Sequence, residues 1–309
     1  MKKIIFAYPN STIALTTTGD KCSLGCAHCN GHYLKNMTSI EDYVESINEN
    51  EKELDTKDLE VDDKNIDNIV KKEIFKYKNR EITSILLSGG CSFEGDVPLI
   101  KHLDTIKYLK ERGYKLNSHL GLMAIKDIEE ICKYIDVASF DMVFDRETIK
   151  EVYKMDKTKE DYIKVYETLK KYIDVSPHIC IGLKGGEIVG EYEVIDYLSK
   201  NPPSKVTFIV LIPTKHTEYE NVDPPKLEEV EKILKEARLK LPNTQINLGC
   251  MRPRGNYRQE LDVIAIKCGV DTIVLPSKKA IRYAIENGYE IQESRECCVL
   301  WLDCLRQVQ

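Results

Sequence analysis

The sequence predicts an α/β protein built on a (β/α)8 barrel of the TIM type, and three observations support this. Short apolar runs rich in β-branched residues recur along the chain, amphipathic helical patterns lie between them, and the 309 residues hold eight such units. Strands that alternate with helices form parallel sheets, and about 250 residues is the usual length of a closed eight-stranded barrel. An open doubly wound sheet is the alternative architecture.

The eight strands are predicted at residues 12–18, 82–87, 116–122, 137–143, 178–183, 206–212, 246–249 and 272–275. The helical patterns are clearest where Tyr162, Val165, Tyr166 and Leu169 share one face at the 3.6-residue period. One connection is long and highly charged, at residues 31–80, and within it residues 67–77 are predicted to be helical. We expect one barrel domain over residues 1–292 and a cysteine-rich tail over residues 293–309.

Composition narrows the class of protein. A hydrophobic content of 42% with 31% charged residues is ordinary for a globular protein. The net charge of -6 argues against a nucleic-acid partner, because duplex binders present a basic face. No apolar run approaches the roughly 20 residues that span a bilayer, and the first residues lead into a short strand-like run. We therefore expect a cytoplasmic protein without a membrane partner.

Cysteine usage departs most from the average. The chain has 11 cysteines, an odd number, and is too long to need disulfide staples, so clustered cysteines are interpreted as metal ligands. Two clusters stand at opposite ends of the sequence. Cys132, Cys180 and Cys268 lie in apolar patterns and are interpreted as small buried hydrophobic residues.

The first cluster follows the first predicted strand, where working residues of a barrel are placed. Cys22, Cys26 and Cys29 have the spacing C-x3-C-x2-C. Three thiolates hold three corners of a [4Fe–4S] cluster, whose usual complement is four cysteines, so one iron remains open. The alternative is a structural zinc site that adds His28 to these cysteines.

This motif, placed after the first strand of a β/α barrel, resembles the radical S-adenosylmethionine (SAM) superfamily. The resemblance implies that the open iron of the [4Fe–4S] cluster binds the amino and carboxylate groups of SAM. An electron then cleaves SAM to methionine and a 5′-deoxyadenosyl radical that abstracts hydrogen from a substrate. His28 departs from the family, which usually has an aromatic residue before the third cysteine.

Further loops are similar to the family's SAM-binding segments. Ser88, Gly89 and Gly90 resemble the start of the Gly-Gly-Glu motif, whose backbone receives the methionyl ammonium, and two glycines permit a close approach. The resemblance also implies that Asp141, at the end of the fourth strand, accepts the ribose hydroxyls; a helix cap is the alternative. The segment with Gly185 and, farther on, Glu191 looks like the one that packs against the adenine of SAM, although an ordinary strand–helix turn would look the same.

The seventh predicted strand resembles that of biotin synthase, in which an arginine enters the barrel beside an auxiliary cluster. This implies a catalytic role for Arg252, with Arg254 as a neighbouring candidate. The alternatives are binding of a substrate carboxylate or phosphate, and simple surface charge.

The tail carries the second cysteine cluster. Cys297, Cys298 and Cys304 fall within eight residues and enclose the only tryptophan. We predict a second [4Fe–4S] cluster with Cys91 as the fourth ligand, because Cys91 stands where the family usually has glutamate; Cys250 is the rival. Burial as small apolar residues is the alternative. Adjacent cysteines point apart on an extended strand, so both can be ligands only if the backbone turns there.

A SAM-binding cluster beside an auxiliary cluster resembles the biotin synthase-like subgroup and implies sulfur insertion into an unactivated C–H bond. The chain looks most like one component of the two-protein lipoyl synthase. That resemblance implies an octanoylated carrier protein, a second radical SAM component, and an electron donor such as ferredoxin or flavodoxin. Two alternatives remain: another biotin synthase-like enzyme, such as a methyltransferase or mutase, and a non-enzymatic metal- or cluster-binding protein.

Overall fold

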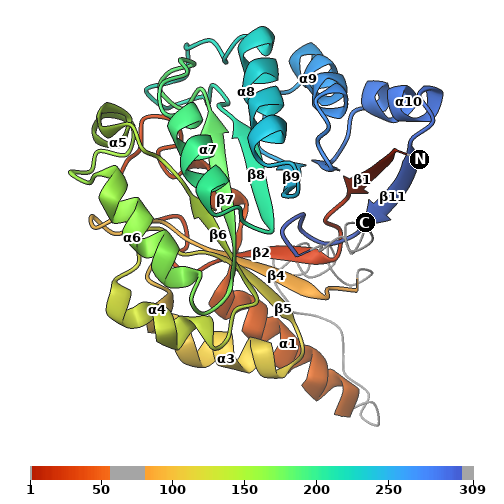
Figure 1. Cartoon of the computed structure of the whole chain (residues 1–309). Coiled ribbons are helices and arrows are strands. Elements are labelled where there is room, and N and C mark those ends of the chain that lie inside the picture. Colours follow the sequence, from red (N-terminus) through yellow and green to blue (C-terminus); the bar gives the residue numbers. More distant parts are fainter. Residues whose placement is uncertain (1, 56–80, 301–309) are drawn as a thin grey trace.

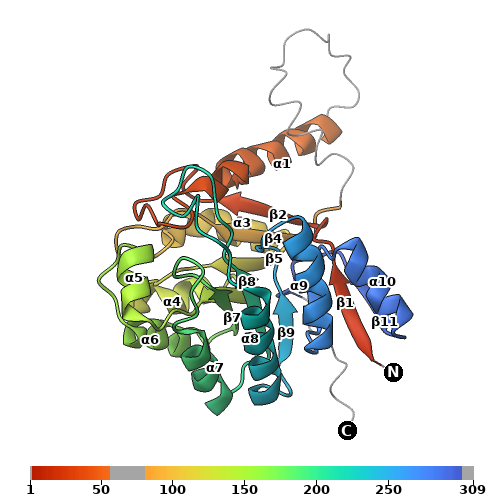
Figure 2. The same ribbon diagram turned by 90° about the horizontal axis from the view of Figure 1, so that it is seen from above.

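The sheet at the centre of the molecule has eleven strands. The computed structural model describes residues 2–55 and 81–300, and in this part of the chain every strand pair is parallel. The strand order is β11-β1-β10-β9-β8-β7-β6-β5-β4-β2-β3, and the sheet curls so that the helices lie along its outside (Figures 1 and 2). The predicted α/β fold of the TIM type is confirmed.

The strands are β1 (Lys3–Ala7), β2 (Thr12–Thr16), β3 (Thr38–Ser39), β4 (Ser84–Ser88), β5 (Lys115–His119), β6 (Val137–Asp141), β7 (Asp174–Ile181), β8 (Lys205–Val210), β9 (Gln245–Leu248), β10 (Thr272–Val274) and β11 (Glu290–Ser294). The helices are α1 (Ile40–Asp55), α3 (Leu103–Glu111), α4 (Ile125–Cys132), α5 (Arg146–Val152), α6 (Lys159–Leu169), α7 (Glu191–Lys200), α8 (Leu227–Lys240), α9 (Asn256–Lys267) and α10 (Lys278–Glu286), with 3-10 turns η1 (His32–Asn36) and η2 (Leu99–His102).

The eight predicted strands correspond to β2 and to β4 through β10, which are neighbours in this order. Three further strands change how the sheet ends. β1 pairs with β10, in the place that β2 would take in a closed ring, and β11 pairs with the other side of β1. In the part of the chain that the structure describes, the sheet is therefore a curled half-barrel with edges at β11 and β3 rather than a closed ring.

The hydrophobic core lies between the sheet and the helices. The outward-facing strand residues are apolar and belong to one continuous cluster with the helices; they include Ile13, Ile85, Leu116, Ala138, Val175, Val206, Ile246 and Ile273. Helix α6 contributes the predicted face of Tyr162, Val165, Tyr166 and Leu169, which is buried. Its start is fixed by a capping box, in which Thr158 and Asp161 satisfy backbone groups that the helix leaves unpaired.

The inner face of the sheet is largely polar, unlike the branched apolar filling typical of TIM barrels, and its apolar part is a patch of Ala7, Val137 and Val274 that packs on Cys298 and Val299. Alternate strand residues point into this lumen, and small polar side chains bond one another from strand to strand. The bonded pairs are Thr12–Ser84, Asn117–Ser139, Ser176–Thr207, Thr207–Asn247, Asn247–Gln245 and Gln245–Thr272. We call these nine residues the polar belt.

The start of the cysteine-rich tail packs on the polar belt. The Cys297 backbone N–H donates to Thr12 Oγ1 at 2.9 Å, and Asn117 Nδ2 lies 3.7 Å from Cys297 Sγ. The backbone turns here, with the Leu300 N–H bonded to the Cys297 carbonyl at 2.9 Å. Lys205, fully buried, donates to the Val299 carbonyl at 2.8 Å and pairs with Asp174 at 2.9 Å. The tail thus closes one end of the lumen.

Two of the features predicted from the sequence cannot be compared with the structure. The helix expected at residues 67–77 and the tail cysteine Cys304 lie outside the described residues. Among the described helices, none is long and apolar enough to cross a membrane.

We predict that Lys205→Met destabilises the fold and loosens the tail. The substitution leaves the Val299 carbonyl and Asp174 without their cation; because Asp174 is 33% exposed, the loss should cost about 2 kcal/mol, as for hydrogen bonds to a charged group. Denaturant unfolding should report this loss, and hydrogen exchange of residues 297–300 should accelerate.

Lys235→Met is the matched control, because the Lys235 side chain is 62% exposed in its pair with Glu231. Its effect should stay within about 0.5 kcal/mol. Equal effects of the two substitutions would contradict a structural role for Lys205.

Candidate metal centre

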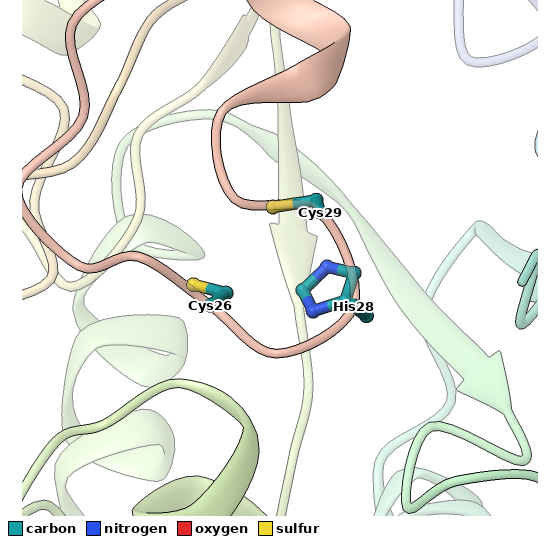
Figure 3. A group of neighbouring side chains, drawn as sticks. All are labelled: Cys26, His28 and Cys29. Carbon is teal, nitrogen blue, oxygen red and sulfur yellow. The ribbon is translucent and has the colours of Figure 1, made fainter. Parts of the chain in front are cut away.

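The loop after β2 folds so that two of the predicted ligands face the same way. The Cys29 and Asn30 N–H groups both donate to the Cys26 carbonyl, at 3.2 and 2.9 Å, which closes a helical turn. The two thiols therefore point to the same side of the loop, with His28 beside them (Figure 3). The ligand atoms of Cys26, His28 and Cys29 all lie within 4.8 Å of one another, close enough to hold one metal centre.

The third predicted ligand, Cys22, borders this group without joining it. Its Sγ lies 3.9 Å from the Cys91 carbonyl, and the neighbouring Ser23 N–H donates to the same carbonyl at 2.9 Å. A charge on Cys22 contributes to raising the pKa of both Cys26 and Cys91, so the thiols are near neighbours. The cysteine loop and the loop that carries Cys91 therefore form one continuous site.

The thiols of the site differ in pKa. Hydrogen bonding between Cys26 and Cys29 lowers the pKa of Cys29 and raises that of Cys26, and His28 lowers the pKa of Cys29 further. Burial, followed by the charge of Cys22, raises the pKa of Cys91 to about 12. Metals bind thiolates, and Cys29 is the member of the set that most readily becomes one.

His28 contributes a nitrogen ligand atom as well. Its Nδ1 is buried and has no hydrogen-bond partner among the described residues, and its ring meets the edge of Tyr153 at 5.6 Å between centroids. The donor set of three thiols fits a cubane cluster, whereas the same thiols with His28 as a fourth ligand would fit zinc. Separate substitutions of Cys22 and of His28 test these two interpretations.

The glycine loop that follows β4 packs directly against the cysteine loop. A Cβ on Gly90 would lie 2.0 Å from the Lys21 carbonyl oxygen and 2.6 Å from the Cys22 Cα, and a Cβ on Gly89 would lie 2.7 Å from Thr17 Oγ1. The Gly90 N–H donates to Thr18 Oγ1 at 2.7 Å. Ser88, which precedes them, accepts the Thr17 N–H at its carbonyl at 2.9 Å. Gly90 is therefore required by the neighbouring backbone, and Gly89 by the threonine side chains packed against it, in addition to the role that the SAM resemblance implies.

Asp141 ends β6 at the same rim of the sheet and is exposed. Its charge contributes to raising the pKa of Cys91, Tyr153 and Tyr162, which places the carboxylate among the residues around the cysteine loop. No ion pair or helix cap involves Asp141 among the described residues. The carboxylate is available to a ligand, as the ribose prediction requires.

Gly185 and Glu191 flank the loop between β7 and α7. Glu191 is buried and its carboxylate accepts three backbone N–H groups, from Gly182, Val189 and Gly190, at 2.7, 2.9 and 3.0 Å. These bonds hold the loop on which Gly185 sits, at a φ of 58°. Glu191 therefore shapes this loop, and its own oxygens are already used.

Arg252, predicted as catalytic, has a structural role instead. Its side chain is fully buried, Nε pairs with Asp262 at 2.8 Å, and the terminal nitrogens donate to the carbonyls of Gly249 and Val274 at 2.5 and 2.8 Å. Every nitrogen of the guanidinium is occupied by protein groups, so it has none to offer a substrate. Arg252 instead ties the end of β9 to β10 and α9.

Cys297 does not lie beside Cys91. Cys297 bonds to Thr12 at the start of β2, opposite Ser84 at the start of β4, whereas Cys91 follows the far end of β4. The four residue steps of β4 alone span roughly 13 Å. In this arrangement Cys297 and Cys91 lie too far apart to bind the same cluster, whereas Cys304 lies outside the described residues.

Cys250, the rival ligand, is nearer to the tail. Cys297 and Cys298 hydrogen-bond each other, and the charge of Cys297 adds to burial in raising the pKa of Cys250. Cys250 follows the end of β9 and is exposed to solvent. Cys250 lies within electrostatic range of Cys297, but among the described residues the ligand atoms of Cys250, Cys297 and Cys298 do not come as close together as those of Cys26, His28 and Cys29.

Two histidines of the site were missed from the sequence. His119 ends β5 and His178 lies in β7, and their rings meet at 5.2 Å between centroids. The available signal was the alternation of polar residues within strands otherwise classed as apolar, such as Asn117 with His119 and Ser176 with His178.

Comparison with known proteins agrees with the fold. No protein-family model and no curated protein matches the chain. Among solved structures, methylornithine synthase (PylB) has a TM-score of 0.59 at 15% identity, covering 95% of this chain and 84% of that one. The FeFe-hydrogenase maturase HydG from Carboxydothermus hydrogenoformans has a TM-score of 0.62 at 18% identity, covering 94% and 67%. SuiB from Streptococcus suis, bound to S-adenosylmethionine, has a TM-score of 0.50 at 13% identity, covering 80% and 51%. The chain shares a TIM-type fold with these proteins, and at these identities the likeness concerns the fold alone.

We predict that Gly90→Ala releases the metal centre as well as weakening SAM binding. The added Cβ has to displace the backbone at Lys21 and Cys22. Iron content after anaerobic reconstitution should fall together with SAM affinity.

Gly113→Ala is the control, because Gly113 has a φ of 87° and open space around its Cβ position, so it tests backbone strain without a collision. It should retain the wild-type iron content. Normal iron content in Gly90→Ala would show that the two loops do not depend on each other.

We predict different outcomes for Cys22→Ala and His28→Phe. A cubane held by three thiols loses a ligand in Cys22→Ala, whereas His28→Phe keeps all three and should retain about four irons at this site. Iron and zinc analysis of the purified variants distinguishes the two interpretations, because a zinc site would contain zinc in place of iron and would lose metal in His28→Phe as well as in Cys22→Ala.

Proposed function

We propose that the protein is a radical SAM enzyme. The observation that carries the proposal is the contact between the cysteine loop and the glycine loop, which brings three thiols and the half-buried backbone of Gly89 to one rim of the sheet. Parallel α/β sheets bind their ligands and substrates at the carboxyl ends of the strands, where both loops lie. The fold shared with PylB, HydG and SuiB supports the same assignment.

The residues have distinct tasks in this proposal. Cys22, Cys26 and Cys29 hold a [4Fe–4S] cluster, and the residues around it exclude other ligands from all but one side. When bound, the cluster supplies the electron that cleaves SAM. Gly89 and Gly90 present backbone to the methionyl end of SAM, and the exposed carboxylate of Asp141 accepts hydrogen bonds from hydroxyl groups. Gly185 lies on the loop that faces the adenine.

The test is anaerobic SAM cleavage by dithionite-reduced protein. Wild type should produce 5′-deoxyadenosine, and a variant with alanine at Cys22, Cys26 and Cys29 should produce none. Cys132→Ala is the matched control, because Cys132 is buried at the end of α4 and belongs to neither thiol group. Cleavage by the triple variant at the wild-type rate would refute the proposal.

We further propose that the tail provides a second [4Fe–4S] cluster and that its sulfur is inserted into a protein-bound octanoyl group, as in a lipoyl synthase component. The support is the position of Cys297 and Cys298 on the polar belt, with Cys250 close to them. Cys304 lies outside the described residues and remains a predicted ligand. The partners in this proposal are an octanoylated carrier protein, a second radical SAM component, and ferredoxin or flavodoxin as the electron donor.

We predict about eight irons per wild-type chain, that is, two cubanes. Alanine at Cys297 and Cys298 should leave about four irons and preserve SAM cleavage, but abolish sulfur transfer to an octanoylated peptide. Comparing Cys91→Ser with Cys250→Ser then identifies the fourth ligand, because only the true ligand should lower the iron content of the second cluster.

The alternatives give different results in the same assay. A wild-type chain with only one cluster's worth of iron that still cleaves SAM would be another biotin synthase-like enzyme, such as a methyltransferase or mutase. A chain that binds iron and cleaves no SAM would be a non-enzymatic cluster-binding protein. Either result would contradict sulfur insertion.

A further inference from the structure

Two histidines line the lumen between the two groups of thiols. His119 is the last residue of β5 and His178 lies on β7, on either side of the strand that ends in Asp141. Strand register places His119 opposite Ser139 and Asp141 opposite His178. Because His119 lies two residues after Asn117 of the polar belt, its side chain points to the same inner face.

The hydrogen bonding of the pair leaves one histidine free. His178 Nδ1 lies 2.9 Å from the Ser176 carbonyl, which can only accept, so the proton is on Nδ1. Its ring meets the His119 ring edge-on, at 5.2 Å between centroids and 66° between planes. His119 makes no hydrogen bond or ion pair among the described residues, and its ring is only partly buried. The structure therefore presents an accessible imidazole, held in place by its neighbour, to the lumen.

The charges nearby favour an uncharged ligand group. Burial lowers the pKa of His119, and it lowers the pKa of His178 to about 4, so both rings are neutral near pH 7. Asp141 is the exposed charge on this part of the wall. The Asp141 charge acts on both rings, and no cation among the described residues acts on either of them. A carboxylate or phosphate in contact with these two rings would therefore meet a negative charge without a cation beside it.

We propose that His119 is a substrate-binding residue that hydrogen-bonds an amide or another uncharged polar group of the substrate in the lumen. This proposal rests on the proposed radical SAM function, since it assumes that the substrate enters the lumen from the rim that carries the cysteine loop. His178 fixes the orientation of the His119 ring, and Asp141 discriminates against anionic substrates. For an octanoyl substrate, the lumen would accept the amide and reject the free acid.

The test compares two probes that differ only in the head group, octanamide and octanoate. Their binding to reconstituted, SAM-bound protein is measured by calorimetry. Wild type should bind octanamide at least tenfold more tightly than octanoate. His119→Leu should lose this preference by at least tenfold, and His119→Gln, which retains hydrogen bonding, should keep it within about threefold of wild type.

His102→Leu is the matched control, because His102 lies on η2 and pairs with Glu41, away from the lumen. It should bind both probes as wild type does. All variants should keep the wild-type SAM affinity and iron content, which verifies that the site is intact.

Two results would overturn the proposal: no preference for the amide in wild type, or an unchanged preference in His119→Leu. SAM cleavage measured on the same samples tests the proposed function separately. Amide binding that depends on His119 in a protein that cleaves no SAM would refute the radical SAM function and leave the assignment of His119 intact.

Discussion

The contact between Gly90 and the cysteine loop is the constraint on which the rest of the site depends. The backbone of the two loops approaches so closely that a Cβ at Gly90 would lie 2.0 Å from the Lys21 carbonyl oxygen. Hydrogen bonds from Ser23 to the Cys91 carbonyl and from the Gly90 N–H to Thr18 lock the approach. The thiols and the backbone edge next to them are therefore positioned by one another, and a cluster and a small ligand could be held side by side only because of this fit.

A second constraint is the division of the sheet into an apolar outer face and a polar inner face. The outer face packs on the helices and supplies the hydrophobic stabilisation of the fold. That leaves the lumen free to carry the polar belt, two histidines and the tail thiols. Buried polar groups are costly unless they are paired, and the belt residues satisfy one another from strand to strand. These hydrogen bonds lower the cost of burying polar groups inside the lumen. The same polar groups make the lumen suitable for a polar ligand.

Features that depend on nearby residues were predictable from the sequence. The C-x3-C-x2-C spacing and the periodicity of eight strands are local patterns, and the strands are found where the patterns place them. The strand β11 was missed because its sequence, Glu-Ile-Gln-Glu-Ser, is polar. The strand β3 was missed because it has only two residues, too few to show an alternation of polar and apolar side chains. These two strands occupy the two edges of the sheet, so within the described residues the sheet is a curled half-barrel and not a closed ring.

Features that depend on distant residues were not predictable. Arg252 was expected to face a substrate, but its side chain is buried and forms an ion pair with Asp262 on the next helix. The tail was expected to reach Cys91, whereas Asn117 and Lys205, each nearly a hundred residues or more away in sequence, hold it on the polar belt instead. Spacing along the chain identifies thiols that can bind metal, but only the fold determines which of them meet.

The central claim is that three thiols leave one iron of a cluster open to SAM, and pulsed electron–nuclear double resonance tests it most directly. The reduced, reconstituted protein is mixed with SAM labelled with ¹⁵N at the amino group and ¹⁷O at the carboxylate. The account predicts hyperfine coupling of both labels to the cluster, lost when Cys22, Cys26 and Cys29 are replaced by alanine. A reduced cluster that shows no coupling to either label would contradict the account.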